Sequence, residues 1–329
     1  MPFARGAPAP ATDDVAQGVA GGAQVLGLMT HLLPRSGRRR RSCHAGRAPR
    51  QAESTGVTRD PDEGLDAAGL LSTGVALDRL RPAYAPVVSD CTAEVRRALG
   101  DRLHGLYLYG SVATGQARLP TSDLDLLAVS LSPVDLVVLE ADLSARHADA
   151  VREVGISRVT LAEVWADDAD GLGLRCFLKH YCVPLAGVDL RPELPPCRPS
   201  RELADALNGD LRAACRAWRS TLDRPGIVRS AARRLLCAAA TLESVEHGGW
   251  TTDRATGADL IARHHPEWTV TVRSALAWTV NPHDADPAAV RDLLDFGDWL
   301  ADRPRGLRTA RRSRDRDRPA RPSPRGRVG

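Results

Sequence analysis

The chain has 329 residues and a formal net charge of +4, but its basic residues are concentrated at the two ends. Residues 1–60 hold nine Arg against four acidic residues, and residues 301–329 hold eleven against three. The intervening residues 61–300 therefore carry 25 basic and 34 acidic residues, a net charge of −9. An acidic body argues against a nucleic-acid partner, and 13 aromatic residues supply few surfaces on which bases could stack.

Composition divides the chain into four parts. Residues 1–75, rich in Ala, Gly, Pro and Arg, show no sustained period, and residues 305–329 alternate Arg, Asp and Pro, so both are predicted to be disordered. Four prolines within residues 192–199 predict a domain boundary. We expect an α/β (α+β) domain with a small mixed sheet over residues 76–191 and an all-α bundle over residues 192–304.

Cysteine usage and hydropathy indicate a cytoplasmic protein. Seven Cys occur without a CxxC pair, and Cys176 and Cys182, the closest two, lack the partners of a zinc site. No apolar run reaches the roughly 18 residues of a membrane span. The apolar stretch 15–33 precedes its arginines, whereas a secretory signal places its positive charge first. Reduced, mostly buried thiols are expected, and the oligomeric state is left open.

The first domain reads as strand, strand, helix, strand. Four apolar residues recur every four positions and predict a helix that ends at Gly100: Val87, Cys91, Val95 and Leu99. Residues 105–109 are typical of a buried strand, and a polar loop is expected over residues 112–122. A second strand is predicted at 123–129, a helical segment at 133–154, and a third, β-branched strand at 156–164.

The second domain reads as helical throughout. Apolar residues between Val228 and Ala239 follow the i, i+3, i+4, i+7 pattern, and Gly248-Gly249 is predicted to end that helix. Shorter helices are predicted at 255–264, 270–278 and 287–300. Five of the six Trp follow residue 200 and are interpreted as core contacts.

One constellation points to chemistry: Gly110-Ser111, eleven intervening residues, and then Asp123-Leu-Asp125. Two Asp separated by one residue project from the same face of a strand, about 7 Å apart. Their mutual repulsion is relieved by a divalent cation, and oxygen ligands favour Mg²⁺ or Mn²⁺. Gly110 allows close approach to a phosphate, and Ser111 can donate to it. A structural turn followed by a loop carboxylate pair is the alternative interpretation, which the arrangement on adjacent strands disfavours.

The segment LYLYGSVATGQARLPTSDLDLLAV resembles the polymerase-β-type nucleotidyltransferase superfamily. Within it the chain is most similar to aminoglycoside adenylyltransferases of the streptomycin/spectinomycin class, with softer support from RRLLCAAATLESVEHGGWTT in the second domain. The resemblance covers about residues 81–300. It implies that Asp123 and Asp125 bind Mg²⁺, that Gly110 and Ser111 hold the ATP triphosphate, and that a hydroxyl acceptor lies between the domains.

Two departures from the family pattern concern the site. The family usually carries a third carboxylate on the next strand, where this chain reads ISRVT from Ile156 to Thr160. Glu153 comes too early and Glu163 too late to replace it. Related enzymes also place a Lys after the long helix to contact the nucleotide. Here Thr252, Asp253 and Arg254 occupy that region, and Arg254 is the expected substitute.

Four further residues have two interpretations each. Of the 45 basic residues 44 are Arg, so Lys179, the one Lys, is either a phosphate ligand or solvent-facing. The neighbouring His180 is interpreted as a packed or capping residue in preference to a base. Glu243 and Glu246 either attract a cationic aminoglycoside or form a solvated helix face.

These features predict an Mg²⁺-dependent nucleotidyltransferase that transfers AMP from ATP to a hydroxyl of a small molecule, with an aminoglycoside as the acceptor that the resemblance implies. The alternative is a catalytically degenerate protein of the same fold, acting as a nucleotide-binding regulator or a toxin–antitoxin partner. A third alternative, transfer to RNA or protein hydroxyls, is disfavoured for RNA by the acidic body. Abundant Arg, Ala, Gly and Pro suggest a GC-rich bacterial genome.

Overall fold

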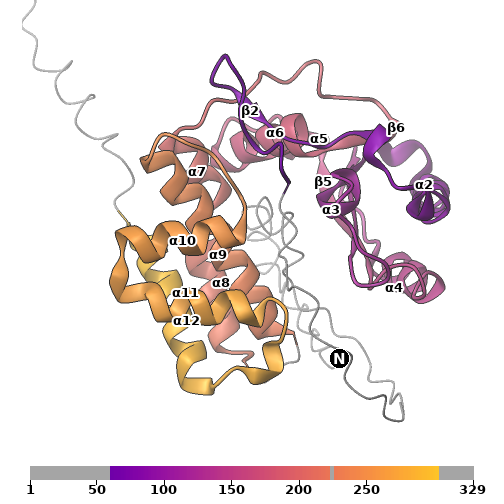
Figure 1. The fold of residues 1–329 in the computed structure, drawn as a ribbon. Coiled ribbons are helices and arrows are strands. Elements are labelled where there is room, and N and C mark those ends of the chain that lie inside the picture. The colour runs from indigo at the N-terminus through magenta and orange to yellow at the C-terminus, as the bar shows by residue number, and fades with distance from the viewer. Residues whose placement is uncertain (1–59, 223–225, 304–329) are drawn as a thin grey trace, which may run out of the picture.

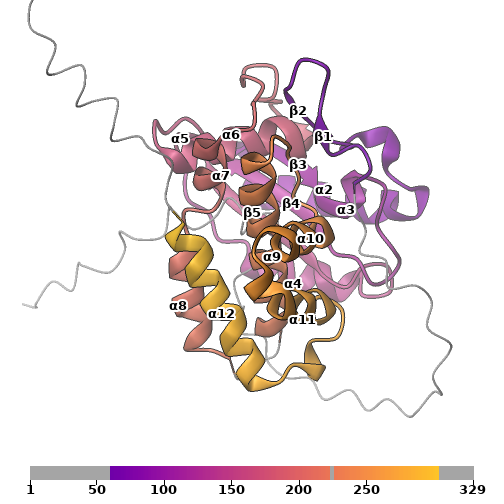
Figure 2. The same ribbon diagram turned by 60° about the vertical axis from the view of Figure 1, so that its left-hand side comes forward.

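A computed structural model describes residues 60–222 and 226–303. Its α/β part, indigo to magenta in Figure 1, adjoins a helical part coloured salmon to yellow, and Figure 2 shows the two parts in contact from a second direction. The described residues thus combine a small mixed sheet with many helices. The predictions of disorder for residues 1–59 and 305–329 lie outside the described residues.

The four-stranded sheet has the order β5-β4-β3-β6. Its strands are β3 (Leu103–Tyr109), β4 (Leu124–Ser130), β5 (Val154–Thr160) and β6 (Val183–Gly187). β3 is antiparallel to both β4 and β6, whereas β4 and β5 are parallel. The register places Asp125 beside Tyr109 on one side and Gly155 on the other. The sheet therefore presents the Asp-x-Asp end of β4 next to the Gly-Ser end of β3.

Alternation along the strands gives the sheet two apolar faces. Leu106, Leu108 and Leu126 pack with α2 (Ala85–Leu99) and α4 (Val137–Arg146) in one buried cluster. Tyr107 and Leu127 point the other way, toward α6 (Ala169–Tyr181), in a cluster that continues into the helical part. Asp125 lies two residues before Leu127 in β4, so the two side chains are on the same face of the sheet. The side chain of Asp125 therefore projects toward the helical part.

The long helix α9 (Ile227–Glu246) is the centre of the helical part. Gly257 lets α10 cross it closely, because a Cβ there would lie 2.6 Å from the carbonyl oxygen of Leu236. Arg234 is 0% exposed, and its guanidinium donates to Asp210 Oδ1 at 2.5 Å and to Asn208 Oδ1 at 2.9 Å. The remaining helices are α7 (Arg201–Leu207), α8 (Leu211–Arg219), α10 (Arg254–His264), α11 (Thr269–Trp278) and α12 (Pro287–Asp302).

Most predicted elements are present, with altered limits. The predicted helices that end at Gly100 and at Gly248-Gly249 correspond to α2 and α9, and those at 255–264, 270–278 and 287–300 to α10, α11 and α12. The loop predicted at 112–122 opens with the end of a helical turn, α3 (Gly110–Ala113). The third strand ends at Thr160, whose side chain caps α5 (Leu161–Val164) in a capping box with Glu163. Of the helical segment predicted at 133–154, α4 is the part that is a regular helix. The sequence analysis did not predict α6 or β6.

The prediction that residues 1–75 are disordered is wrong for residues 60–75. Strands β1 (Gly64–Leu65) and β2 (Leu71–Ser72) form a short antiparallel pair. The backbone N–H of Leu71 donates to the carbonyl of Cys197 at 2.9 Å, which fixes this pair of strands to the proline-rich segment, residues 192–199. These residues are ordered by contacts with segments that are distant in the sequence. A repeating pattern of apolar residues within 60–75 could not have predicted those contacts. The division of the chain into two domains stays a prediction.

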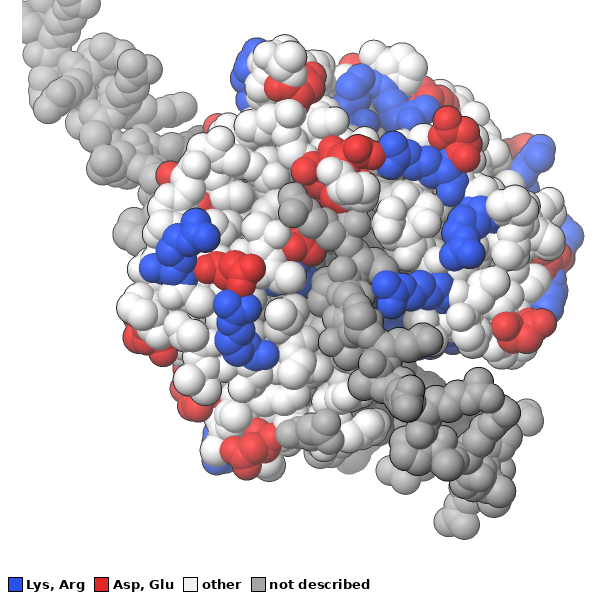
Figure 3. All heavy atoms as spheres, in the orientation of Figure 1, with Lys and Arg blue, Asp and Glu red and all other residues white. Residues whose placement is uncertain are grey.

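The described cysteines are free, and all but Cys197 are buried. None of the helices in the described ranges combines the length and the apolar character that crossing a membrane requires. On the face shown in Figure 3, acidic and basic side chains lie interspersed over the described surface.

Loss of Asp210 should destabilise the bundle strongly, because Arg234 would remain buried without its carboxylate partner. We expect Asp210→Ala to lower the free energy of unfolding by about 3–5 kcal/mol in urea denaturation. Asp295→Ala is the matched control, since Asp295 pairs with Arg219 at the surface and that Arg keeps Asp298. The control should cost less than about 1 kcal/mol. Equal losses in the two variants would contradict a structural role for the buried pair.

Candidate active site

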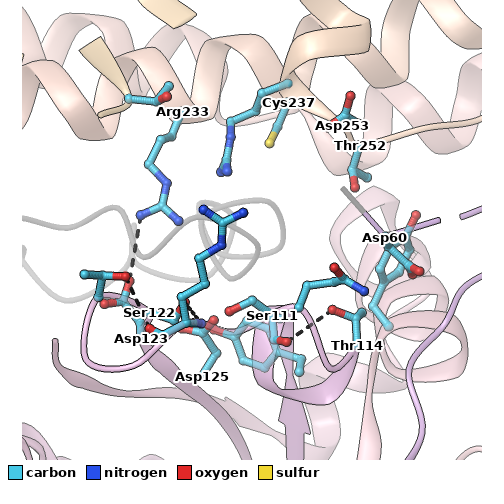
Figure 4. A pocket seen from close by; sticks show the side chains of 18 of the residues that line it. Asp60, Ser111, Thr114, Ser122, Asp123, Asp125, Arg233, Cys237, Thr252 and Asp253 are labelled. Carbon is cyan, nitrogen blue, oxygen red and sulfur yellow. Dashed lines mark hydrogen bonds and ion pairs between the residues drawn. The ribbon is translucent and has the colours of Figure 1, made fainter. Parts of the chain in front are cut away.

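A cleft of about 620 Å³ lies between the sheet and the helical part. Its floor is formed by the ends of β3 and β4 with the loop that joins them, and its opposite wall by α9 and the start of α10 (Figure 4). Asp123, Asp125, Gly110 and Ser111 all line it, so the structure brings together the four residues of the Gly-Ser/Asp-x-Asp constellation.

Asp123 lies directly before β4, is 5% exposed and has two arginines beside it. Its Oδ2 accepts from the Arg152 guanidinium, and Nη1 of Arg233 lies 3.8 Å away from the same oxygen. Its Oδ1 is buried without a hydrogen-bond partner among the described residues. Since a buried carboxylate oxygen is costly to leave unpaired, this atom marks a place for a positively charged ligand.

Asp125 faces the same side as Asp123, as the spacing predicts. Burial raises the pKa of Asp125 well above its usual range, and the neighbouring Asp123 raises it further, while Arg233 opposes both effects. The pair therefore resists full ionisation unless more positive charge is present. Binding a divalent cation would supply that charge.

Gly110 is the residue that makes room for Asp125. It has φ +73°, and a Cβ built on it would overlap Oδ2 of Asp125. It opens the helical turn α3, in which Ser111 follows and faces the cleft (Figure 4). The hydroxyl of Thr114 donates to the carbonyl of Ser111 at 3.2 Å and holds the turn closed.

Besides Arg118, four arginines line the cleft, and only Arg254 was predicted to belong to the site. Arg229 and Arg233 lie one turn apart on α9, and Arg152 comes from the segment before β5. Burial lowers the pKa of both α9 arginines, and the charge of Arg152 on Arg229 and of Arg254 on Arg233 lowers it further. Nε of Arg229 and Nε of Arg254 are buried without a hydrogen-bond partner among the described residues. Buried guanidinium groups with unpaired donors are suited to an anionic ligand.

Glu63 joins the two parts of the molecule at the edge of the cleft. Its Oε1 accepts from Tyr181 Oη at 3.0 Å and from Thr252 Oγ1 at 2.6 Å. Its Oε2 accepts from Thr251 Oγ1 at 2.8 Å and from the backbone N–H of Thr252 at 2.9 Å. Burial raises its pKa, and these hydrogen bonds oppose the rise. Glu63 thus holds the loop before α10, where Arg254 begins the helix, against α6.

Several residues singled out in the sequence lie elsewhere. Lys179 is not among the residues lining the cleft, and its ammonium donates to the carbonyl of Arg191 at 2.7 Å, which replaces the phosphate-ligand interpretation with a structural one. His180 packs against the proline-rich segment, where its Nε2 accepts from the backbone N–H of Cys197 at 2.9 Å.

Glu243 and Glu246 also lie outside the cleft lining. Glu243 is 0% exposed and pairs with Arg303, and Glu246 binds Arg201 Nη1 at 2.7 Å. Arg303 pairs with both and joins them to the end of α12, so Glu243 forms no solvated face, whereas Glu246 is exposed.

No carboxylate of β5 replaces the missing third acid. Gly155 and Ser157 are the β5 residues opposite Asp125 and Leu127, and Ser157 Oγ pairs with Tyr109 Oη at 3.1 Å. Glu153 is exposed and reaches the site only through its charge, which adds to the raised pKa of Asp125. The carboxylate of Glu163 is engaged by Thr160 in the capping box. Within the described ranges, no cluster of three or more His, Cys, Asp and Glu is arranged to hold a metal ion.

The other carboxylates of the cleft already accept hydrogen bonds from the protein. Asp60 accepts from the backbone N–H of Gly74 at 2.6 Å, and Asp253 caps α10 by accepting from the N–H of Thr256 at 2.8 Å. Glu63 takes four hydrogen bonds on its two oxygens. Asp60 and Glu63 were missed because they fall in the region predicted to be disordered. The i, i+4 spacing of Arg229 and Arg233 was the available signal for a basic stripe on α9.

Comparisons with known proteins identify no family. No family model matches the chain, and no curated protein matches it. Among solved structures, it is similar to spectinomycin adenyltransferase AAD(9) from Enterococcus faecialis, solved with ATP and spectinomycin. That likeness covers 65% of this chain and 99% of the other at 14% sequence identity, with a TM-score of 0.45. A likeness at this level carries no functional conclusion, which has to come from the residues of the cleft.

Gly110→Ala tests the close fit between the glycine turn and Asp125. Gly248 is the control, since it also has a positive φ of +77° but an added Cβ would meet no atom within 4 Å. Both substitutions should lose about 1–2 kcal/mol of unfolding free energy to backbone strain. Gly110→Ala should lose about 1–3 kcal/mol more through overlap with the carboxylate. In an Asp125→Ala background this excess should disappear, and an excess that persists there would refute the contact.

Proposed function

We propose that this protein is an Mg²⁺-dependent nucleotidyltransferase that transfers AMP from ATP to a hydroxyl of a small molecule. The observation that carries the proposal is the Asp123/Asp125 pair, packed against the Gly110-Ser111 turn and walled by arginines in one cleft. Metal ligands, a phosphate-approaching turn and anion-binding side chains are the parts that phosphoryl and nucleotidyl transfer require.

The residues present fit a magnesium ion. Asp123 Oδ1 is buried without a protein partner, and the raised pKa of Asp125 reflects negative charge that a cation would offset. Asp123 and Asp125 would hold the ion, in keeping with the preference of Mg²⁺ for one or two carboxylates together with substrate phosphates. When bound, the ion neutralises phosphate charge and stabilises the charge that develops during transfer.

The four arginines would orient the triphosphate. Arg233 approaches the aspartates from α9, and Arg254 enters from the start of α10, so phosphate oxygens near the Asp pair would be contacted from the wall opposite the floor (Figure 4). Guanidinium groups bind phosphates in a bidentate manner and remain charged at neutral pH. The amide and hydroxyl of Ser111 would contact the phosphates from the floor.

In the proposed reaction the acceptor hydroxyl oxygen attacks the α-phosphorus of ATP. A new phosphorus–oxygen bond forms, the bond from the α-phosphorus to the bridging oxygen breaks, and pyrophosphate leaves with its electron pair. Arg152 and Arg233 can stabilise the leaving charge because they already lie beside Asp123. β5 offers no carboxylate to accept the hydroxyl proton, so in this reaction the proton passes to solvent water.

The absence of a carboxylate base on β5 favours a second candidate function, a nucleotide-binding regulator of the same fold. Gly155 and Ser157 occupy the β5 positions beside the pair, and neither can act as a carboxylate base. A regulator would need the phosphate-binding arginines and the metal ligands but no base. ATP binding without pyrophosphate release is the result that distinguishes it from the enzyme.

The acceptor is proposed only as a small molecule that carries a hydroxyl. An aminoglycoside is the first class to test, although Glu243 and Glu246 do not line the cleft and would not attract it. Asp60 and Asp253 line the same cleft as the Asp pair and are carboxylates that such a cation would meet.

Pyrophosphate release from ATP and Mg²⁺ should be detected with at least one member of a panel of aminoglycosides and neutral polyols. Asp125→Asn keeps the shape of the side chain but removes a metal ligand, so its rate should fall by at least about 100-fold. Circular dichroism and thermal melting control for folding. If the wild type and the variant are equally inert while both bind ATP, the regulator is the better description. Absence of ATP binding would contradict both the transferase and the nucleotide-binding regulator.

Arg233→Ala should weaken binding of ATP–Mg²⁺ by about 10- to 100-fold, since one charge-assisted contact contributes about 1.5–3 kcal/mol. Isothermal titration calorimetry measures the change. Arg263→Ala is the control with the same loss of charge, because Arg263 lies exposed at the other end of α10, outside the residues that line the cleft. Equal weakening in both variants would point to a general charge effect and contradict a direct contact.

A further inference from the structure

A second reactive cluster lies where α6 meets the proline-rich segment before α7. Cys176, on α6, is 0% exposed, and Cys197 is partly exposed. Cys176 lies four residues before His180 on the same face of α6, and its side chain interacts with that of Cys197. His180, one turn further along α6, accepts from the backbone N–H of Cys197 through Nε2 at 2.9 Å. Two thiols and an imidazole are thus held together by α6 and the segment that crosses it.

The two thiols differ in chemical character. A side-chain hydrogen bond with Cys176 lowers the pKa of Cys197 to about 5, with smaller contributions from His180 and the charge of Arg175. The same hydrogen bond and burial raise the pKa of Cys176 well above its usual range. A partly exposed thiolate next to a buried, protonated thiol is the arrangement of an attacking and a resolving cysteine.

The remaining described cysteines do not have a lowered pKa. Burial raises the pKa of Cys91 and of Cys215 to about 12, and it also raises the pKa of Cys182 and Cys237. A selective reagent would therefore find Cys197 first. This difference also provides unreactive comparators within the same chain.

We propose that Cys197 and Cys176 form a redox-active thiol pair that hydrogen peroxide converts into a disulfide. The inference is independent of the nucleotidyltransferase function, since neither cysteine lines the cleft. Nothing in the Gly-Ser/Asp-x-Asp site uses these residues.

The reaction consumes one peroxide. The Cys197 thiolate attacks one peroxide oxygen, the oxygen–oxygen bond breaks, and the departing hydroxide takes a proton and leaves as water, which gives a sulfenic acid at Cys197. The Cys176 sulfur then attacks the Cys197 sulfur, the sulfur–oxygen bond breaks, and a second water leaves with the Cys176 proton. The two thiols are oxidised by two electrons, and the peroxide is reduced to two water molecules.

The disulfide would fasten the proline-rich segment to α6, next to the N-terminal strands. The backbone N–H of Leu71 donates to the Cys197 carbonyl at 2.9 Å, and Arg198 Nη1 donates to the carbonyl of Ala68 at 2.6 Å. Because a cross-link restricts the unfolded chain, the oxidised protein should melt at a higher temperature than the reduced protein.

Peptide mapping of the full chain after treatment with equimolar hydrogen peroxide tests the pair. A Cys176–Cys197 disulfide is expected, with Cys91 and Cys215 still alkylated as free thiols. In Cys176→Ser, Cys197 should instead be trapped by dimedone as its sulfenic acid, and in Cys197→Ser neither product should form. No disulfide together with no dimedone adduct at Cys197, or a disulfide between other cysteines, would overturn the proposal.

A second measurement uses the wild type and needs no variant to fold. Alkylation of Cys197 by iodoacetamide should be nearly independent of pH between 6 and 8, because a thiol whose pKa is about 5 is already ionised there. An ordinary thiol reacts about tenfold faster per pH unit over the same range. A rate at Cys197 that climbs tenfold per unit, or that matches the rate at Cys91, would contradict the assigned reactivity.

Discussion

Two carboxylates that line one cleft, Asp123 directly before β4 and Asp125 within it, impose the constraint on which the site depends. Asp125 cannot move away, because β4 is paired on both sides and its register fixes Asp125 between Tyr109 and Gly155. Arg152 and Arg233 partly compensate their charge, and Arg233 belongs to α9. The electrostatic requirement of the strand is therefore met in part by the helical part, which makes the meeting of the two parts a condition of the site.

Polar contacts with little freedom then fix how the parts meet. Glu63 takes four hydrogen bonds from α6 and the loop before α10, so a segment near the start of the described chain sets the position of Arg254. Arg234, the neighbour of Arg233, is turned into the bundle core by its pairing with Asp210. Adjacent arginines on α9 thus face opposite ways, one anchoring the helix and the other reaching the aspartates.

The features that sequence could predict are the local ones. Period-four apolar residues identified α2, and alternation placed Asp123 and Asp125 on one face of the strand predicted at 123–129. Arg152 and Glu63 belong to the site because of tertiary docking, which no pattern along the chain reports. The same limit explains Lys179: its rarity in the sequence suggested a phosphate ligand, yet in the fold its ammonium donates to the backbone carbonyl of Arg191. Composition likewise suggested disorder for residues 60–75, whose order comes from contacts with Cys197 and Tyr181.

Under the proposed function, the sizes of the contributions to catalysis favour a slow enzyme over a protein that only binds a nucleotide. Lack of a positioned base costs a factor of about 10²–10⁴, or roughly 3–6 kcal/mol of barrier. Orientation of two reactants in one site is worth about 7–11 kcal/mol, and fixed charges around the phosphates add to it. Phosphoryl-type transfer depends mainly on these two terms, which under the proposed function would come from Asp123, Asp125 and the arginines. The missing carboxylate therefore lowers the expected rate without removing the larger sources of catalysis, provided that the acceptor hydroxyl is held in line with the α-phosphorus.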